Sequence, residues 1–149
     1  VNGVLLNTDN QNHEIKTKIK HLSENTKSYQ KIKAAVDKNS KAIFQGKIFV
    51  DPKAQKTNGY QLSKAILLNE ESEFNSKPEL EIYADDVKCS HGSASGSLDE
   101  NSIFYLMSRG LNYQQSKELL INGFLMDVVE KITDVEIKNL ITNIIGLKQ

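Results

Sequence analysis

The chain has 149 residues, which is enough for one domain with a buried core. Its content of 38% hydrophobic and 26% charged residues is typical of globular proteins. The 19 basic residues balance the 19 acidic ones, which disfavours a nucleic-acid-binding protein, and no run of 18 apolar residues is present to span a membrane.

The single cysteine, Cys89, cannot form an internal disulfide. Together with the lack of a secretory signal, this indicates a reducing compartment. The sequence starts at Val1 on an apolar, strand-like stretch without an initiator Met. We therefore interpret the chain as a piece of a longer protein.

Up to about Gly96 the sequence predicts short β-strands, namely Lys16–His21, Ala42–Val50, Lys64–Asn69 and Leu80–Ala84. Predicted turns separate them at Asp51–Pro52, Asn58–Gly59 and Asn75–Pro78. The apolar runs centred on Phe49, Leu67 and Ile82 recur at intervals of roughly 15 to 18 residues. Runs this short cannot each bury a face alone, so they fit either the stacked rungs of a β-solenoid or a β-sandwich.

One stretch in this half, residues 23–40, is ambiguous. It fits a short amphipathic helix with Tyr29, Ile32, Ala35 and Val36 facing inward, and it fits a pair of strands equally well. The local pattern does not separate the two.

After Gly96 the period changes to that of helices. Three segments each start with a capping pattern, at Ser97 with Glu100, Asn112 with Gln115, and Thr133 with Glu136. Two glycines are placed to end helices, Gly110 after the first segment and Gly146 after the third. The second segment carries an apolar stripe formed by Leu119, Leu120, Phe124, Val128 and Ile132. We predict a β part over residues 1–96 and a small helical domain over residues 97–149.

The residues available for chemistry are few. The sequence has no phosphate-binding glycine loop and no nucleophile elbow, and its only histidines are His13, His21 and His91. In a strand, Cys89 and His91 share one face, so both can reach one metal atom, or the imidazole can lower the pKa of the thiol. The plainer alternative is a cysteine packed as a small hydrophobe beside a histidine near a turn. A zinc site usually takes four ligands, which Cys89 and His91 alone do not supply.

The aspartate pair and the single arginine can each be explained by a structural role instead of a functional one. The carboxylates of Asp85 and Asp86 point to opposite faces of an extended chain and make a poor acid–base pair. Arg109, the only arginine, precedes Gly110, where it either complements the dipole of the first helix or contributes to an interface.

Four ordered stretches resemble the SufB/SufD family of iron–sulfur cluster assembly scaffolds, and SufD-like members more closely: Ile43–Leu62, Ala65–Ser72, Leu80–Gly92 and Ile103–Gly110. The resemblance covers roughly residues 15–132. Gly92 after His91 is the SufD-like choice, where SufB-like chains tend to have an acidic residue. The sequence departs from the family at "HGSASG" and "QLSKAILL" without losing the small residues of the turn.

The resemblance implies a mainly β fold with C-terminal helices, namely the last rungs of a right-handed parallel β-helix followed by a small helical domain. It implies a non-catalytic scaffold that pairs with a SufB-like chain and docks a SufC-like ATPase through the helical region, around Phe104, Tyr105 and Arg109. His91, and more weakly Cys89, would bind a nascent iron–sulfur cluster shared with the partner. Flavin is associated with such complexes, but no flavin site is evident in the sequence.

The resemblance also sets the remaining expectations. We expect no nucleic acid and no membrane as partners, and a location in the bacterial cytoplasm or the plastid stroma. Because the chain lacks a phosphate loop, we expect no ATP hydrolysis by the chain itself. The alternatives are a SufB-like paralogue that carries the cluster-building site, or a carbohydrate-active β-helix enzyme; the latter is disfavoured by the absence of tryptophan and of a row of carboxylates.

Overall fold

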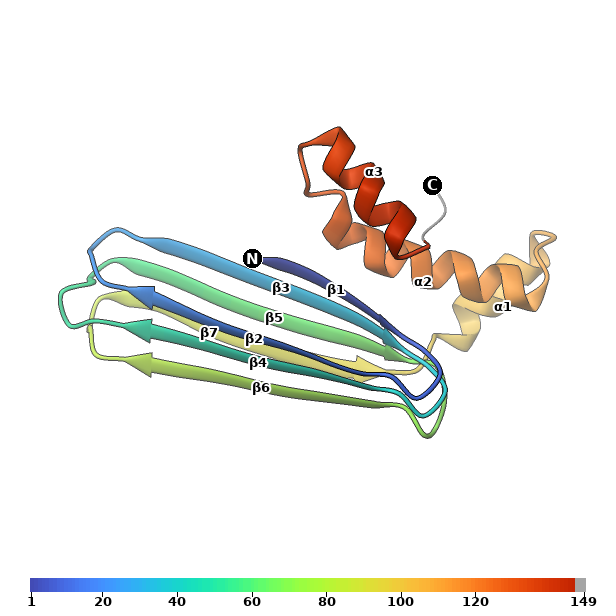
Figure 1. Ribbon diagram of the computed structural model, residues 1–149, viewed down its shortest axis with the longest axis horizontal. Helices are drawn as coiled ribbons and strands as arrows, with labels where there is room; N and C mark the ends of the chain where they lie inside the picture. The colour runs from blue at the N-terminus through green and yellow to red at the C-terminus, as the bar shows by residue number, and fades with distance from the viewer. Residues whose placement is uncertain (147–149) are drawn as a thin grey trace.

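The computed structural model describes residues 1–146, which form two stacked parallel β-sheets with helices at one end (Figure 1). The elements in chain order are β1 (Asn2–Asn7), β2 (Asn12–His21), β3 (Lys27–Val36), β4 (Lys41–Val50), β5 (Thr57–Leu67), β6 (Glu73–Ile82), β7 (Val87–Gly96), α1 (Glu100–Ser108), α2 (Tyr113–Val129) and α3 (Val135–Ile144). Strands β1, β3, β5 and β7 form sheet A, and β2, β4 and β6 form sheet B. This is a parallel β-solenoid of about three turns followed by helices, which confirms the fold class implied by the resemblance.

Each turn of the solenoid uses one strand from each sheet. The chain runs along sheet A and returns along sheet B, so each strand from β1 to β5 pairs with the strand two places further on. In sheet B, for example, Val50 of β4 is the register partner of Ile82 of β6. The apolar runs centred on Phe49 and Ile82 lie in sheet B, and the run centred on Leu67 lies in sheet A. The interval between successive apolar runs in the sequence therefore corresponds to half a turn of the solenoid.

The core lies between the sheets and is built by alternation along the strands. In β4 every second residue is buried, including Phe44, Ile48 and Val50, all with no exposed surface. Ala42 on the same face of β4 packs with Ala34 and Ala65, which face inward from sheet A. Burial of this kind, repeated turn after turn, lets short strands share one continuous core.

Residues 23–40, which the sequence leaves ambiguous, contain strand β3 (Lys27–Val36). All residues from Gln30 to Val36 are buried, on both faces of the strand. Ile32 points into the core, while Ala35 packs on the other face against Leu125 and Val129 of α2. Helix α2 thus covers the outer face of sheet A, and this removes the alternation that would have identified a strand.

Two of the predicted turns are wrong. Asn58–Gly59 lies inside β5, and Asn75–Pro78 lies inside β6. Gly59 is needed for close packing, because a Cβ there would lie 3.3 Å from the Cys89 sulfur. Pro78 is tolerated because β6 is an edge strand of sheet B, where an amide hydrogen is not required.

The three predicted helices are present, but two of their starts differ from the prediction. The N-caps of α1 and α3 are Asp99 and Asp134, whose carboxylates accept hydrogen bonds from backbone amides of the first turn. The predicted capping box of Asn112 and Gln115 is confirmed at the start of α2. Gly110 and Gly146 follow the C-caps with positive φ values of 98° and 66°, as predicted for helix ends.

The apolar stripe predicted for the second helical segment is only partly buried. Val128 is 2% exposed, whereas Leu119 is 50% exposed, and Leu125 and Val129 supply much of the buried surface instead. No helix within residues 1–146 is long and apolar enough to cross a membrane.

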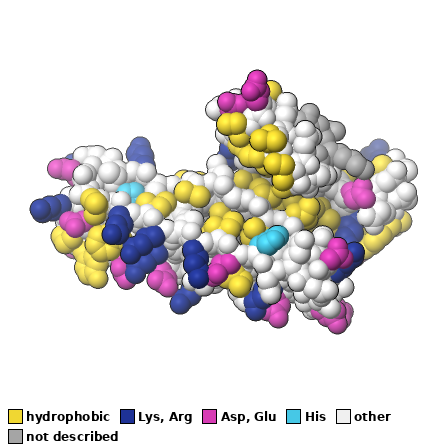
Figure 2. Space-filling model, viewed as in Figure 1, with side chains coloured by type: hydrophobic (Ala, Val, Ile, Leu, Met, Phe, Trp, Pro, Cys, Tyr) yellow, Lys and Arg dark blue, Asp and Glu magenta, His cyan; other side chains and the backbone are white. Residues whose placement is uncertain are grey.

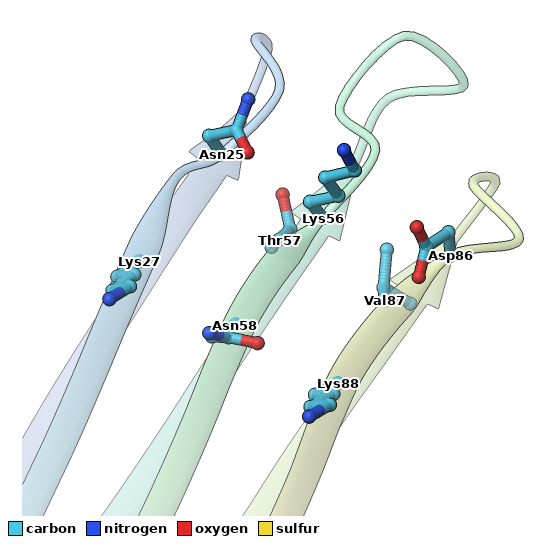
Figure 3. Close-up of a pocket in the computed structure, with 8 residues that line it drawn as sticks. All are labelled: Asn25, Lys27, Lys56, Thr57, Asn58, Asp86, Val87 and Lys88. Carbon is cyan, nitrogen blue, oxygen red and sulfur yellow. The ribbon is translucent and has the colours of Figure 1, made fainter.

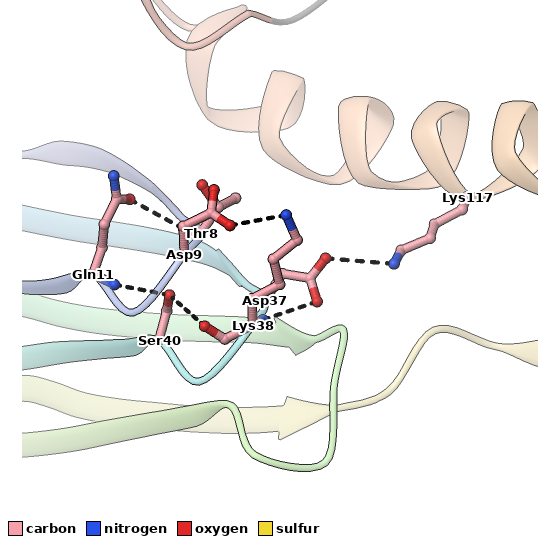
Figure 4. Close-up of polar contacts among 7 residues, drawn as sticks. All are labelled: Thr8, Asp9, Gln11, Asp37, Lys38, Ser40 and Lys117. Carbon is pink, nitrogen blue, oxygen red and sulfur yellow. Dashed lines mark hydrogen bonds and ion pairs between the residues drawn. The ribbon is translucent and has the colours of Figure 1, made fainter.

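Polar contacts join the turns at one end of the solenoid to helix α2 (Figure 4). The Lys38 ammonium bonds the Asp9 carboxylate at 2.9 Å across neighbouring turns, and this hydrogen bond lowers the pKa of Asp9. Asp37, in the same turn as Lys38, forms an ion pair at 3.6 Å with Lys117 of α2. The helix is therefore tied to the end of the sheets as well as to their face.

Candidate functional site

Strands β6 and β7 form the last edge of each sheet within the described residues, so one end of the solenoid is open. Cys89 and His91 both lie on β7, two residues apart, on the side of the strand that faces the space between the sheets. Their register partners on β5 are Gly59 and Gln61, which are buried on the same face. The alternation expected from the sequence thus places thiol and imidazole on one face of an edge strand.

Cys89 is half-buried at the rim of the core. Its side chain packs against a cluster formed by Ile48, Val50, Ala54 and Ala84, and its sulfur fills the space left by Gly59. This is the packing of a small apolar side chain, the plainer of the two alternatives from the sequence. The half-buried position nevertheless leaves the thiol next to the open edge.

His91 is exposed, because within residues 1–146 no strand follows β7 in sheet A to cover it. Within residues 1–146, no group of three or more His, Cys, Asp or Glu side chains is placed to hold a metal ion. Any metal or cluster bound through His91 would therefore need ligands from another chain.

The two aspartates before β7 lie outside the strand that carries His91. Asp85 and Asp86 lie in the bend that leads into β7. The backbone of Asp86 bonds the preceding turn, accepting from the amide of Lys56 at 2.6 Å and donating to the Gln55 side chain at 2.9 Å. These contacts fix the turn rather than create a site for proton transfer.

The SufBD core domain of the SUF system for iron–sulfur cluster assembly matches residues 1–124. The chain belongs to the SufBD core family. The match includes all seven strands, the edge with Cys89 and His91, helix α1 and most of α2.

Several SufBD proteins are similar to the chain. The iron–sulfur cluster assembly protein SufD of Escherichia coli is 36% identical over 146 residues, which cover 98% of this chain and 34% of that protein. A SufBD family protein of Synechocystis is 43% identical over 67% of the chain and 22% of that protein. The chloroplastic protein ABCI7 of Arabidopsis thaliana is 41% identical over 68% of the chain and 21% of that protein. The chain thus spans between a fifth and about a third of the length of these relatives.

The residues predicted to contact an ATPase lie together on α1. Phe104 is 75% exposed and Tyr105 is 57% exposed, which is unusual for aromatic side chains. Arg109 is the C-cap of α1, and its guanidinium lies 5.2 Å from the centre of the Tyr105 ring. We call the exposed side chains of Phe104, Tyr105 and Arg109 the α1 surface.

An apolar groove adjoins the α1 surface. It has a volume of about 380 Å³ between α1 and α2 and is lined by Tyr105, Leu106, Leu119 and Leu120, with polar residues of the α1 N-terminus at its rim. Figure 2 shows that hydrophobic side chains also gather elsewhere on the helical part of the molecule. The most exposed of these on α3 are Val135 and Ile144. The helical part therefore presents apolar surface that the described residues leave uncovered.

Another cavity lies at the turns, away from this surface (Figure 3). It has a volume of about 470 Å³, and Lys27, Asn58 and Lys88 stand at equivalent positions on three neighbouring strands. Lys56 and Asp86 add one charge of each sign. Its lysines extend into solvent, and His91 does not line it.

Sequence reasoning missed the polar groups inside the solenoid. His21 is only 4% exposed, and both of its ring nitrogens bond hydroxyl groups, those of Thr26 and Ser28, at 2.7 and 2.8 Å. Gln30 and Gln61 are also buried on the inner face. The signal that would have revealed the glutamines is their spacing, because Gln30, Gln61 and His91 recur once per turn.

Proposed function

We propose that the chain acts as a SufD-like scaffold in iron–sulfur cluster assembly, with His91 as a ligand at a site shared with a SufB-like chain. The observation that supports this most directly is the position of His91 on the inner face of an exposed edge strand in a member of the SufBD core family. An imidazole there can share a cluster with a second chain placed against the edge. Cys89, whose thiol sits half-buried beside it, is the weaker candidate ligand.

The open edge also supports pairing with another chain. Strands β6 and β7 expose unpaired backbone groups, which favour the addition of a strand from a partner. We place the SufB-like partner at this edge, where its ligands would complete the coordination of the cluster. The cluster is cargo that is assembled and passed on, not a resident cofactor of the chain.

Energy for assembly would come from a SufC-like ATPase docked on the α1 surface. The exposed Phe104 and Tyr105 and the adjoining groove supply the kind of aromatic and apolar anchors that dominate protein interfaces. The chain itself would act as a scaffold without ATP turnover.

The test of the cluster site is the substitution His91→Ala in the complex reconstituted with SufB-like and SufC-like partners. We expect the complex to form normally and the yield of protein-bound iron and sulfide to fall at least several-fold, because one ligand of the shared site is lost. His13→Ala is the matched control, since His13 is also an exposed histidine but lies on β2 at the opposite edge of sheet B. A normal cluster yield with His91→Ala would remove His91 from the site.

A further inference from the structure

A row of hydrogen-bonding side chains crosses the interior of the solenoid and ends at His91. Gln30 on β3, Gln61 on β5 and His91 on β7 are successive register partners in sheet A. At the start of the row, the Thr17 hydroxyl on β2 donates a hydrogen bond to Oε1 of Gln30. Other parts of the interior are occupied by apolar clusters that include Ala34 and Ala65 or Ile48 and Val50.

The two glutamines are buried without sufficient partners. Gln30 has no exposed surface and Gln61 is 3% exposed. Within residues 1–146, Nε2 of Gln30 and both amide atoms of Gln61 have no hydrogen-bond partner. A buried amide without partners is costly, and native proteins rarely retain one without a function.

The surroundings of Gln61 limit where those partners are found. Across the interior, Gln61 faces Gly46 of β4, where an added Cβ would lie 3.1 Å from Nε2, and glycine offers no side-chain group. Along the sheet its neighbours are Gln30 on one side and His91 on the other. Side-chain amides at paired positions of parallel strands bond along the sheet, and Oε1 of Gln30 has a second lone pair to accept from Nε2 of Gln61.

We propose that Gln61 is the positioning residue for His91. Its Oε1 accepts a hydrogen bond from one imidazole N–H, directly or through one water molecule, while its Nε2 donates to Gln30. The other ring nitrogen of His91 then keeps its lone pair and is directed toward the open edge, as a metal ligand requires. Histidines that bind metals are commonly held in one tautomer by such a partner. This inference rests on the proposed role of His91.

The tautomer of His91 can be measured directly, without any cluster. The experiment records the imidazole nitrogen resonances of the intact protein in alkaline buffer. The His91 signals are identified by their loss in His91→Asn. Gln61→Met keeps the length of the side chain and removes the acceptor, and Gln61→Glu keeps an acceptor.

We expect Gln61→Met to change the tautomer ratio of His91 about fivefold, the equilibrium factor of one hydrogen bond of ordinary net strength. Gln61→Glu should retain the tautomer of the unsubstituted protein. The control Gln45→Met, on the outer face of β4 where Gln45 bonds Glu14 at 2.9 Å, should leave the ratio unchanged.

An unchanged ratio in Gln61→Met, or the same change in Gln61→Met and Gln61→Glu, would overturn the inference. If His91→Ala abolishes cluster yield while Gln61→Met leaves the tautomer unchanged, the proposed site stands and the positioning role fails. If Gln61→Met changes the tautomer while His91→Ala gives a normal cluster yield, the contact exists but does not serve the proposed site.

Discussion

His21 illustrates how one buried side chain couples the fold to pH. Burial lowers the pKa of His21, because the charged imidazolium loses its hydration in the interior. The Thr26 hydroxyl that bonds its Nδ1 also contacts the Thr57 hydroxyl at 3.0 Å, so the ring belongs to a network of neutral groups that joins successive turns. The neutral ring therefore contributes to stability, whereas the charged ring would disturb the network.

We predict that the free energy of unfolding falls as the pH is lowered through the range below about 6.5. The pKa of His21 is lower in the folded state than in the unfolded state, so the unfolded chain binds the proton first and gains stability as the pH drops. Above about 6.5 both states are neutral at this position and the contribution is complete. Urea unfolding at a series of pH values measures the slope.

The substitution His21→Gln should remove this part of the pH dependence, whereas His13→Gln, at an exposed position, should retain it. If both variants keep the slope of the unsubstituted protein, His21 is not its source.

At the scale of elements, Asp127 of α2 holds the helix on sheet A. Its carboxylate bonds Lys31 and, at 2.6 Å, Lys33, two lysines on the outer face of β3 whose side chains are about 10% exposed or less. These hydrogen bonds hold the pKa of Asp127 well below its usual range. Lys33 also donates to the Phe124 carbonyl at 2.8 Å and lies over the Phe124 ring. The lysines are thus held between strand and helix.

We predict that Asp127→Asn lowers the free energy of unfolding by about 1–3 kcal/mol at neutral pH, because it leaves two nearly buried lysines without their counterion. The value is below that for a fully buried pair, since the carboxylate is 47% exposed. The difference between variant and unsubstituted protein should shrink as the pH falls below about 3.9, where the carboxylate is neutral in the unfolded chain and its contribution begins to be lost.

Denaturant unfolding measures both effects, and Glu130→Gln serves as the control, because Glu130 is an exposed acidic residue at the C-cap of the same helix. Equal stability of Asp127→Asn and Glu130→Gln would show that the ion pairs do not hold the helix.

The contact between α2 and β3 also explains which strands the sequence could predict. Strand β4 alternates strictly and was evident, because only one of its faces is buried. Strand β3 was ambiguous, because α2 buries its outer face and even its lysines. That burial depends on a residue almost one hundred positions further along the chain, which no local pattern contains. The N-cap aspartates were missed because a Ser or Thr one or two residues earlier offered a competing capping pattern.

For the whole molecule, the candidate site was predictable only in part. The spacing of Cys89 and His91 on one strand placed both side chains on one face, as the structure shows. The spacing could not predict that β7 lies at the edge of sheet A, because this position follows from the order of the strands in the sheet. The partners of His91 along the sheet are likewise a consequence of stacking, one turn apart in the sequence. The candidate site is therefore a surface that forms only when the turns are stacked.

The α1 surface is the second candidate interaction surface of the molecule. The double substitution of Phe104→Asp and Tyr105→Asp tests its role in the assembled complex. We expect the affinity for the SufC-like ATPase to fall by at least tenfold, because two aromatic anchors are replaced by charges that would be desolvated on binding. Both side chains are more than half exposed, so the fold should be retained, which circular dichroism checks. Leu22→Asp is the control, since Leu22 is 59% exposed but follows β2, the opposite edge strand of sheet B, away from the helices (Figure 1). Calorimetric titration with the ATPase measures the affinities. An unchanged affinity of the double variant would place the docking site elsewhere, and the exposed face of α3 would then be the next surface to test.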